Sequence, residues 1–69
     1  AVDDGAFEVV TGKVKEVRKY GNVTVLLFER ITEIEMVAFQ EVDITEGDDV
    51  EVIAIEEDGR TIIHRIRRL

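Results

Sequence analysis

The stretch VTGKVKEVRKYGNVTVLLFE (10–29) carries the alternation of apolar and polar residues that is typical of β-strands. One side of its first half carries Val10, Gly12 and Val14. Val17 breaks this even-numbered phase, which predicts a β-bulge near Lys15–Glu16. Because a bulge bends and twists the strand that contains it, we expect a long first strand that coils round a small barrel.

Gly21-Asn22 predicts a tight turn, and the residues after it predict a second strand over 23–29. This strand is apolar in both phases, whereas a strand with one wet face is apolar in only one. We expect the core-facing set to be Val23, Val25 and Leu27. Leu26 and Phe28 would then point outwards, either as the floor of a binding face or as a second packing seam.

The rest of the chain predicts three more strands, over 34–39, 50–56 and 61–68. Gly47-Asp48 and Asp58-Gly59 supply turn signals, and 40–49 is too short for more than a turn or so of helix. The predicted fold class is all-β, a small five-stranded barrel with little or no helix between strands three and four. We expect one domain over 1–69, with a loose N-terminal leader over 1–8.

In this order, the segments resemble the OB-fold, in the nucleic-acid-binding form of anticodon-binding domains, replication protein A and archaeal single-strand-binding proteins. The resemblance covers about residues 9–68. The motifs that carry it are VTGKVKEVRKYGNVTVLLFE (10–29), IEMVAF (34–39), ITEGDDVEV (44–52) and EEDGRTIIHRI (56–66).

Members of this family bind single strands on the outer face of the second and third strands, between two flanking loops. The resemblance implies an apolar platform of Leu26, Phe28, Val37 and Phe39. It also implies flanking contacts from Arg18, Lys19, Tyr20, Arg65 and Arg67. Bases would stack on the platform while the basic groups hold the phosphates.

Charge weighs against a generic polyanion binder, since the net charge is −7. The basic residues fall in two blocks, and none lies between Ile31 and Gly59. Segregation of this kind allows one basic face on an acidic protein. Glu33 and Glu35, however, share the phase of Val37 and Phe39 and place carboxylates on the platform.

Catalytic and metal chemistry lack their usual residues, because the chain has no Cys and no Ser, and His64 is its only histidine. No Gly-rich phosphate loop is present, and Asp48-Asp49 beside Gly47 is typical of a turn. We expect no enzyme activity and no cofactor. No apolar run approaches the length of a membrane helix and no signal peptide opens the chain, so we expect a cytoplasmic location. We also expect a monomer.

The leading hypothesis is a non-catalytic module that binds single-stranded DNA or RNA. The alternative is a structural or protein-interaction barrel, natural or designed, in which the same face contacts a partner, a second copy or nothing. An oligosaccharide-binding module is a third option, but it would require more aromatic and amide side chains than this chain has.

Overall fold

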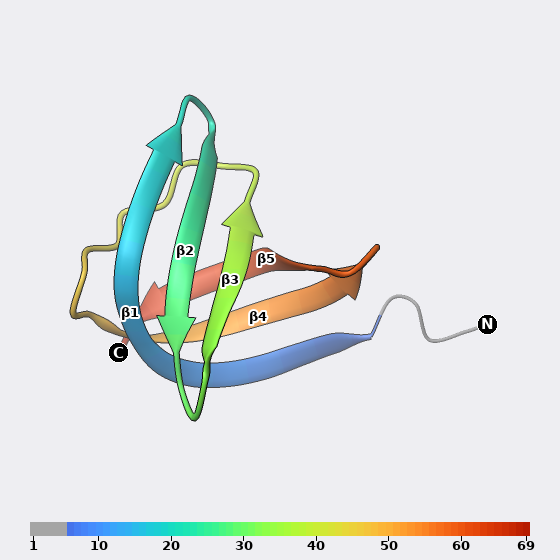
Figure 1. Ribbon diagram of the computed structural model, residues 1–69, viewed down its shortest axis with the longest axis horizontal. Coiled ribbons are helices and arrows are strands. Elements are labelled where there is room, and N and C mark those ends of the chain that lie inside the picture. Colours follow the sequence, from blue (N-terminus) through green and yellow to red (C-terminus); the bar gives the residue numbers. More distant parts are fainter. Residues whose placement is uncertain (1–5) are drawn as a thin grey trace.

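A computed structural model describes residues 6–69, which form five β-strands and no helix (Figure 1). The strands are β1 (Phe7–Tyr20), β2 (Val23–Glu29), β3 (Glu33–Ala38), β4 (Asp49–Glu57) and β5 (Arg60–Arg68). Positive φ angles at Gly21, Gly47 and Gly59 mark the turns that the sequence predicts. Phe7 and Glu8 already belong to β1, so this part of the expected leader is strand, while positions 1–5 lie outside the described residues.

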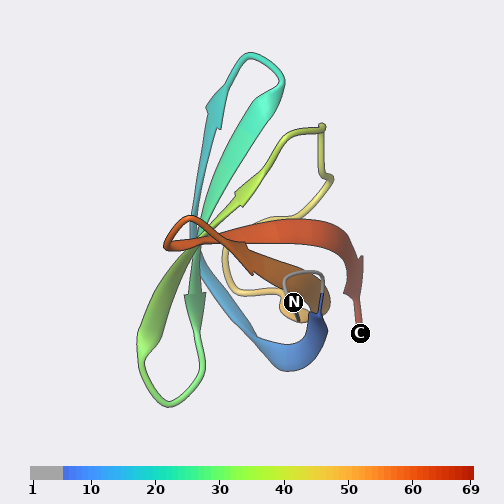
Figure 2. The same cartoon turned by 90° about the vertical axis from the view of Figure 1, so that its right-hand side faces the viewer.

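The strands close into a barrel in the order β1-β2-β3-β5-β4. All neighbours are antiparallel except β3 and β5, which run parallel and pair only at Met36–Thr61 and Val37–Ile62. The architecture is a small mixed β-barrel of the kind expected for an OB-like chain. In both views the β1–β2 hairpin projects beyond the body of the barrel (Figures 1 and 2).

The long first strand, β1, pairs with two neighbouring strands of the barrel. Its first half pairs with β4 and its second half with β2, and the register shifts between Val14 and Glu16. Lys15 is therefore the extra residue of a bulge, at the position that the change of phase predicts. The bend lets one strand run along both sides of the barrel, as Figure 1 shows.

The core contradicts one part of the sequence-based prediction. Leu26 and Phe28 are both 0% exposed and lie at the centre of the barrel. The opposite set, Val23, Val25 and Leu27, faces outwards and is only half-buried. The expected orientation of β2 was therefore wrong, and Leu26 and Phe28 are not platform residues.

Gly12 explains how so small a barrel holds a phenylalanine. A Cβ atom at Gly12 would lie 2.6 Å from Cζ of Phe28 and 2.6 Å from the carbonyl oxygen of Glu29. The bare backbone of β1 thus forms the wall against which the Phe28 ring packs. The other buried apolar residues are Val14, Leu26, Met36, Ala38, Val42, Ile44, Val50, Val52, Ala54 and Ile63.

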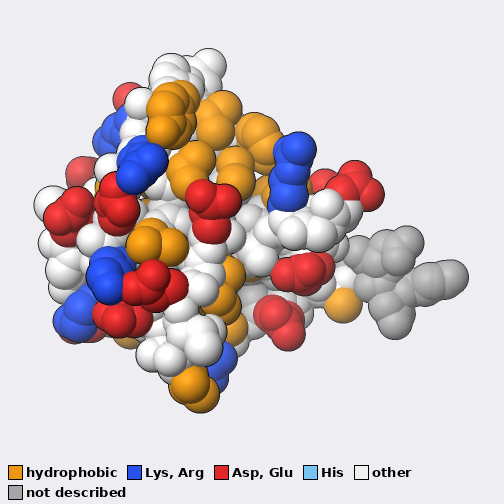
Figure 3. Space-filling view, viewed as in Figure 1, with side chains coloured by type: hydrophobic (Ala, Val, Ile, Leu, Met, Phe, Trp, Pro, Cys, Tyr) orange, Lys and Arg blue, Asp and Glu red, His pale blue; other side chains and the backbone are white. Residues whose placement is uncertain are grey.

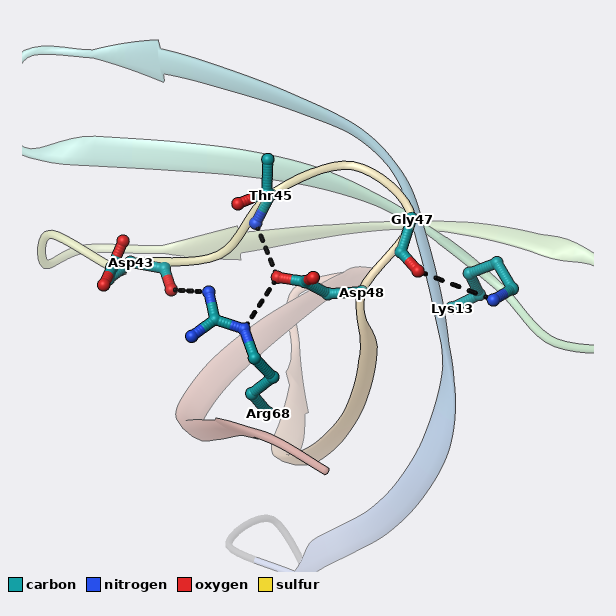
Figure 4. A network of polar contacts seen from close by, with 6 residues as sticks. All are labelled: Lys13, Asp43, Thr45, Gly47, Asp48 and Arg68. Carbon is teal, nitrogen blue, oxygen red and sulfur yellow. Dashed lines mark hydrogen bonds and ion pairs between the residues drawn. The ribbon is translucent and has the colours of Figure 1, made fainter.

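The segment between β3 and β4 is an extended loop, as expected, and it contributes Val42 and Ile44 to the core. Figure 4 shows how polar contacts anchor it. Asp48 accepts hydrogen bonds from the Thr45 backbone N–H and from Nε of Arg68, both at 2.9 Å. Arg68 also donates to the carbonyl oxygen of Asp43 at 2.7 Å. These contacts hold the loop against the barrel, with Val42 and Ile44 in the core.

Candidate functional site

The outward side chains of β1, β2 and β3 form a continuous surface, which we call the hairpin face. Directly opposite residues on paired strands point to the same side of a sheet, so the register places them in rows. The first row holds Tyr20 and Val23, with Phe39 exposed just after β3; the second holds Arg18, Val25 and Val37; the third holds Glu16, Leu27 and Glu35. Successive rows lie about 6.8 Å apart, which is the length of two residues along a strand.

Along the hairpin, this face changes from aromatic to acidic. Tyr20 is 59% and Phe39 57% exposed, so two aromatic rings flank the aliphatic residues between them. In Figure 3, orange side chains gather over the upper part of β1, β2 and β3, with blue side chains on both flanks and red ones below. The face therefore combines rings, an aliphatic floor and charges of both signs.

A shallow depression of about 260 Å³ lies on this surface. Its lining is Glu16, Arg18, Tyr20, Val25, Leu26, Leu27 and Glu35. A second depression begins on the other side of β3, where Val37 and Glu35 meet Arg60 of the β4–β5 hairpin. Arg18 and Arg60 thus lie on the two sides of Val25 and Val37, which we call the aliphatic floor.

Ion pairs engage part of this charge. Nε of Arg18 lies 2.7 Å from Oε2 of Glu16, and this contact, with a smaller contribution from Tyr20, raises the pKa of Arg18 above its ordinary value. Lys15 pairs with Glu33, which, with the nearby Glu29, raises the pKa of Lys15. Glu35 makes no hydrogen bond or ion pair with any residue in the range 6–69.

The structure brings together only some of the residues that the resemblance implied. Arg18, Tyr20, Val37 and Phe39 lie on the hairpin face, whereas Leu26 and Phe28 are in the core. Lys19 lies directly opposite the buried Thr24 and so points away from the face. The structure therefore does not bring Lys19 together with Arg18 on this face.

Arg65 and Arg67 belong to another surface. They line a depression on β4 and β5 together with Glu51, Ile53 and Ile66. Nε of Arg67 lies 2.8 Å from Oε1 of Glu51. Because β5 pairs with β3 only at Thr61 and Ile62, the strand has left the hairpin face before it reaches these arginines.

Val25 and Leu27 face outwards on the hairpin face, whereas the sequence-based prediction assigned both to the core. The signal that identifies them is the turn. A two-residue turn at Gly21-Asn22 sets Tyr20 opposite Val23 and Arg18 opposite Val25. A surface Arg18 therefore implies an outward Val25, because opposite residues share a face.

Comparison of the chain with known protein families, with curated proteins and with solved structures finds no match. Within the described range, no group of His, Asp or Glu side chains is arranged to hold a metal ion. That part of the chain also has no helix long and apolar enough to span a membrane.

Proposed function

We propose that the chain is a non-catalytic module that binds single-stranded nucleic acid on the hairpin face. The observation that carries the proposal is the pair of exposed rings, Tyr20 and Phe39, in the row next to the aliphatic floor of Val25 and Val37. Bases stack on such rings and on apolar surfaces without a need for a fixed sequence.

The two arginines that flank the floor provide the contacts to the sugar-phosphate backbone. Arg18 lines the depression on the β1 side, and Arg60 lies beside Val37 on the β5 side. A strand that crosses β2 and β3 between them would place its bases on the sheet and its phosphates at the edges. This arrangement differs from the one that the resemblance implies, in which Lys19, Arg65 and Arg67 join Arg18 at the phosphates.

Binding on this face should be weak and only mildly dependent on salt. Stacking contributes about 1–3 kcal/mol per base, and two rings supply two such contacts. The two arginine contacts would give a slope of log K against log salt of about −1.4, at about −0.7 per contact on single strands. The net charge of −7 opposes tighter binding to a polyanion.

The test is a fluorescence-anisotropy titration of labelled single-stranded DNA and RNA at low salt and at higher salt. We expect Tyr20→Ala and Phe39→Ala each to weaken binding by about tenfold, the equivalent of one stacked base. Phe7→Ala is the matched control, because Phe7 is also exposed but lies on β1 where that strand pairs with β4. Absence of any binding at low salt, or equal losses in all three variants, would contradict the proposal.

A protein-interaction or structural barrel is the second candidate, and a specific observation favours it. Five of the nine basic side chains form ion pairs with carboxylates of residues 6–69, including Arg18 on the hairpin face. Carboxylates of Glu16 and Glu35 also line the central depression, where a basic partner would fit better than phosphate. This candidate predicts no binding of any oligonucleotide and a change in hairpin-face NMR shifts when a short apolar peptide that carries lysines is added.

A further inference from the structure

Glu35 differs from Glu16, the other carboxylate of its row, because it makes no ion pair with any residue of the described range. It projects from the middle of β3, directly opposite Leu27, into the central depression. The neighbouring carboxylate in the same row, Glu16, already binds Arg18 at 2.7 Å. Glu35 has no such partner among residues 6–69, so its oxygens are available to a ligand.

An ionised carboxylate only accepts hydrogen bonds, and this property distinguishes between bases. Cytosine presents an N4 amino group and adenine an N6 amino group, and both can donate to a carboxylate. Thymine presents the O4 carbonyl oxygen at the corresponding position. Where O4 faces the carboxylate, two acceptors are opposed, and the one donor on this edge of thymine is the neighbouring N3–H.

The spacing of the rows brings a base within reach of this carboxylate. A base stacked over Val25 and Val37 lies one row away from Leu27 and Glu35, a distance of about 6.8 Å along the strands. One edge of such a base therefore points at the third row. The depression of about 260 Å³ at this place has the aliphatic floor on one side and Glu35 on the other.

We propose that Glu35 makes the hairpin face selective for single strands whose bases carry an exocyclic amine, with cytosine bound in preference to thymine or uracil. This inference rests on the proposed nucleic-acid function and specifies its ligand. The Glu16–Arg18 pair keeps the second carboxylate of the row engaged, so that Glu35 alone makes the selection. In the first row, the Tyr20 hydroxyl is the one side-chain group that can form a hydrogen bond. The rings of Tyr20 and Phe39 in this row supply affinity for any base.

The experiment compares oligodeoxycytidine and oligothymidine of equal length by anisotropy, at neutral pH and low salt, with the full chain. We expect cytidine to bind about five- to tenfold more tightly, as for one hydrogen bond at the low end of base discrimination. Glu35→Gln should bring the two affinities together, because the amide can turn its donor towards the thymine carbonyl.

Glu46→Gln is the matched control for the lost charge. Glu46 is exposed in the loop before β4 and lines none of the surface depressions described above. Both substitutions remove one negative charge, so both weaken the general repulsion of phosphates, which does not depend on the base. Only Glu35→Gln should change the ratio of the two affinities.

The outcomes separate the two proposals. If both oligonucleotides bind and thymidine binds as well as cytidine, the selectivity is wrong and the binding function stands. A cytidine preference that survives in Glu35→Gln would show that another group makes the selection and would overturn the role of Glu35. If neither oligonucleotide binds the native chain, the binding function itself fails, and the inference fails with it.

Discussion

Phe28 and Phe39 have opposite environments, although both are phenylalanines of the β2–β3 unit. The ring of Phe28 is completely buried, and Phe39 is 57% exposed. We expect Phe28→Ala to lower the free energy of unfolding by about 3–5 kcal/mol, through lost burial and the cavity it leaves. Phe39→Ala should change it by about 0.5 kcal/mol or less, as is usual at the surface.

Urea denaturation of the two variants and the native chain measures this difference. Equal losses of unfolding free energy in the two variants would mean that β2 does not point Phe28 into the core. The small effect at Phe39 also matters for the binding test, because any loss of affinity in Phe39→Ala then reports on the face and not on the fold.

The orientation of β2 also shows the limit of reading each strand by itself. Thr24 shares the inward phase with Leu26 and Phe28, and this polar residue makes the inward set look like the wetter one. Thr24 lies directly opposite Ala38 of β3, and this small neighbour leaves room for the hydroxyl of Thr24 inside the barrel. Pairing across the turn gives the correct answer, since Val14 lies opposite Phe28 and both must share a face.

At the scale of elements, the sequence predicted the strands well because glycine and asparagine marked their ends. Gly21, Gly47 and Gly59 all adopt positive φ angles at turns. The position of the bulge followed from a single break in phase at Val17. The anchoring of the loop over 39–48 could not be predicted, because it depends on Arg68, which is far away in the sequence and reaches the loop only once the barrel has closed.

That anchoring should be sensitive to acid. The N–H of Thr45 and the guanidinium of Arg68 both bind the carboxylate of Asp48 and lower its pKa below the ordinary value. A carboxyl group with a lowered pKa in the folded state contributes stability above its unfolded pKa of about 3.9. This contribution is lost as the pH falls through the folded pKa, when Asp48 becomes protonated.

Asp48→Asn should therefore reduce stability at neutral pH and flatten the part of the acid-denaturation curve below about pH 4. Asp43→Asn is the matched control, because Arg68 binds the backbone carbonyl of Asp43 and not its side chain. Urea midpoints measured from neutral pH down to about pH 3 test this. A native pH dependence retained in Asp48→Asn would contradict the assignment.

For the whole molecule, closure of the barrel is uneven. The β1–β4 seam has seven residue pairs and the β4–β5 seam eight, whereas β3 and β5 meet through two. Local opening begins where the fewest hydrogen bonds and contacts must be broken. The barrel should therefore open first between β3 and β5, while its other seams stay closed.

Native-state hydrogen exchange followed by NMR tests this order of opening. The amides that join Met36 and Val37 to Thr61 and Ile62 should exchange with a smaller opening free energy than those of the β1–β4 seam. They should also respond weakly to denaturant, since a local opening exposes little surface. If both seams exchange only through global unfolding, the barrel opens as a single unit and the prediction is wrong.

The bulge at Lys15 has a consequence for how a lineage of such proteins could diverge. Deletion of Lys15 would remove the bulge and leave the phase of the rest of β1 unchanged, because Val14 and Glu16 already pair with the adjacent residues Phe28 and Leu27. Deletion of Val17 would instead turn Arg18 and Tyr20 inwards, so this half of β1 tolerates a change of length at the bulge and not beyond it. In the loop over 39–48, the positions away from the core residues Val42 and Ile44 and from the contacts of Arg68 have no packing to preserve, so differences in chain length should accumulate there.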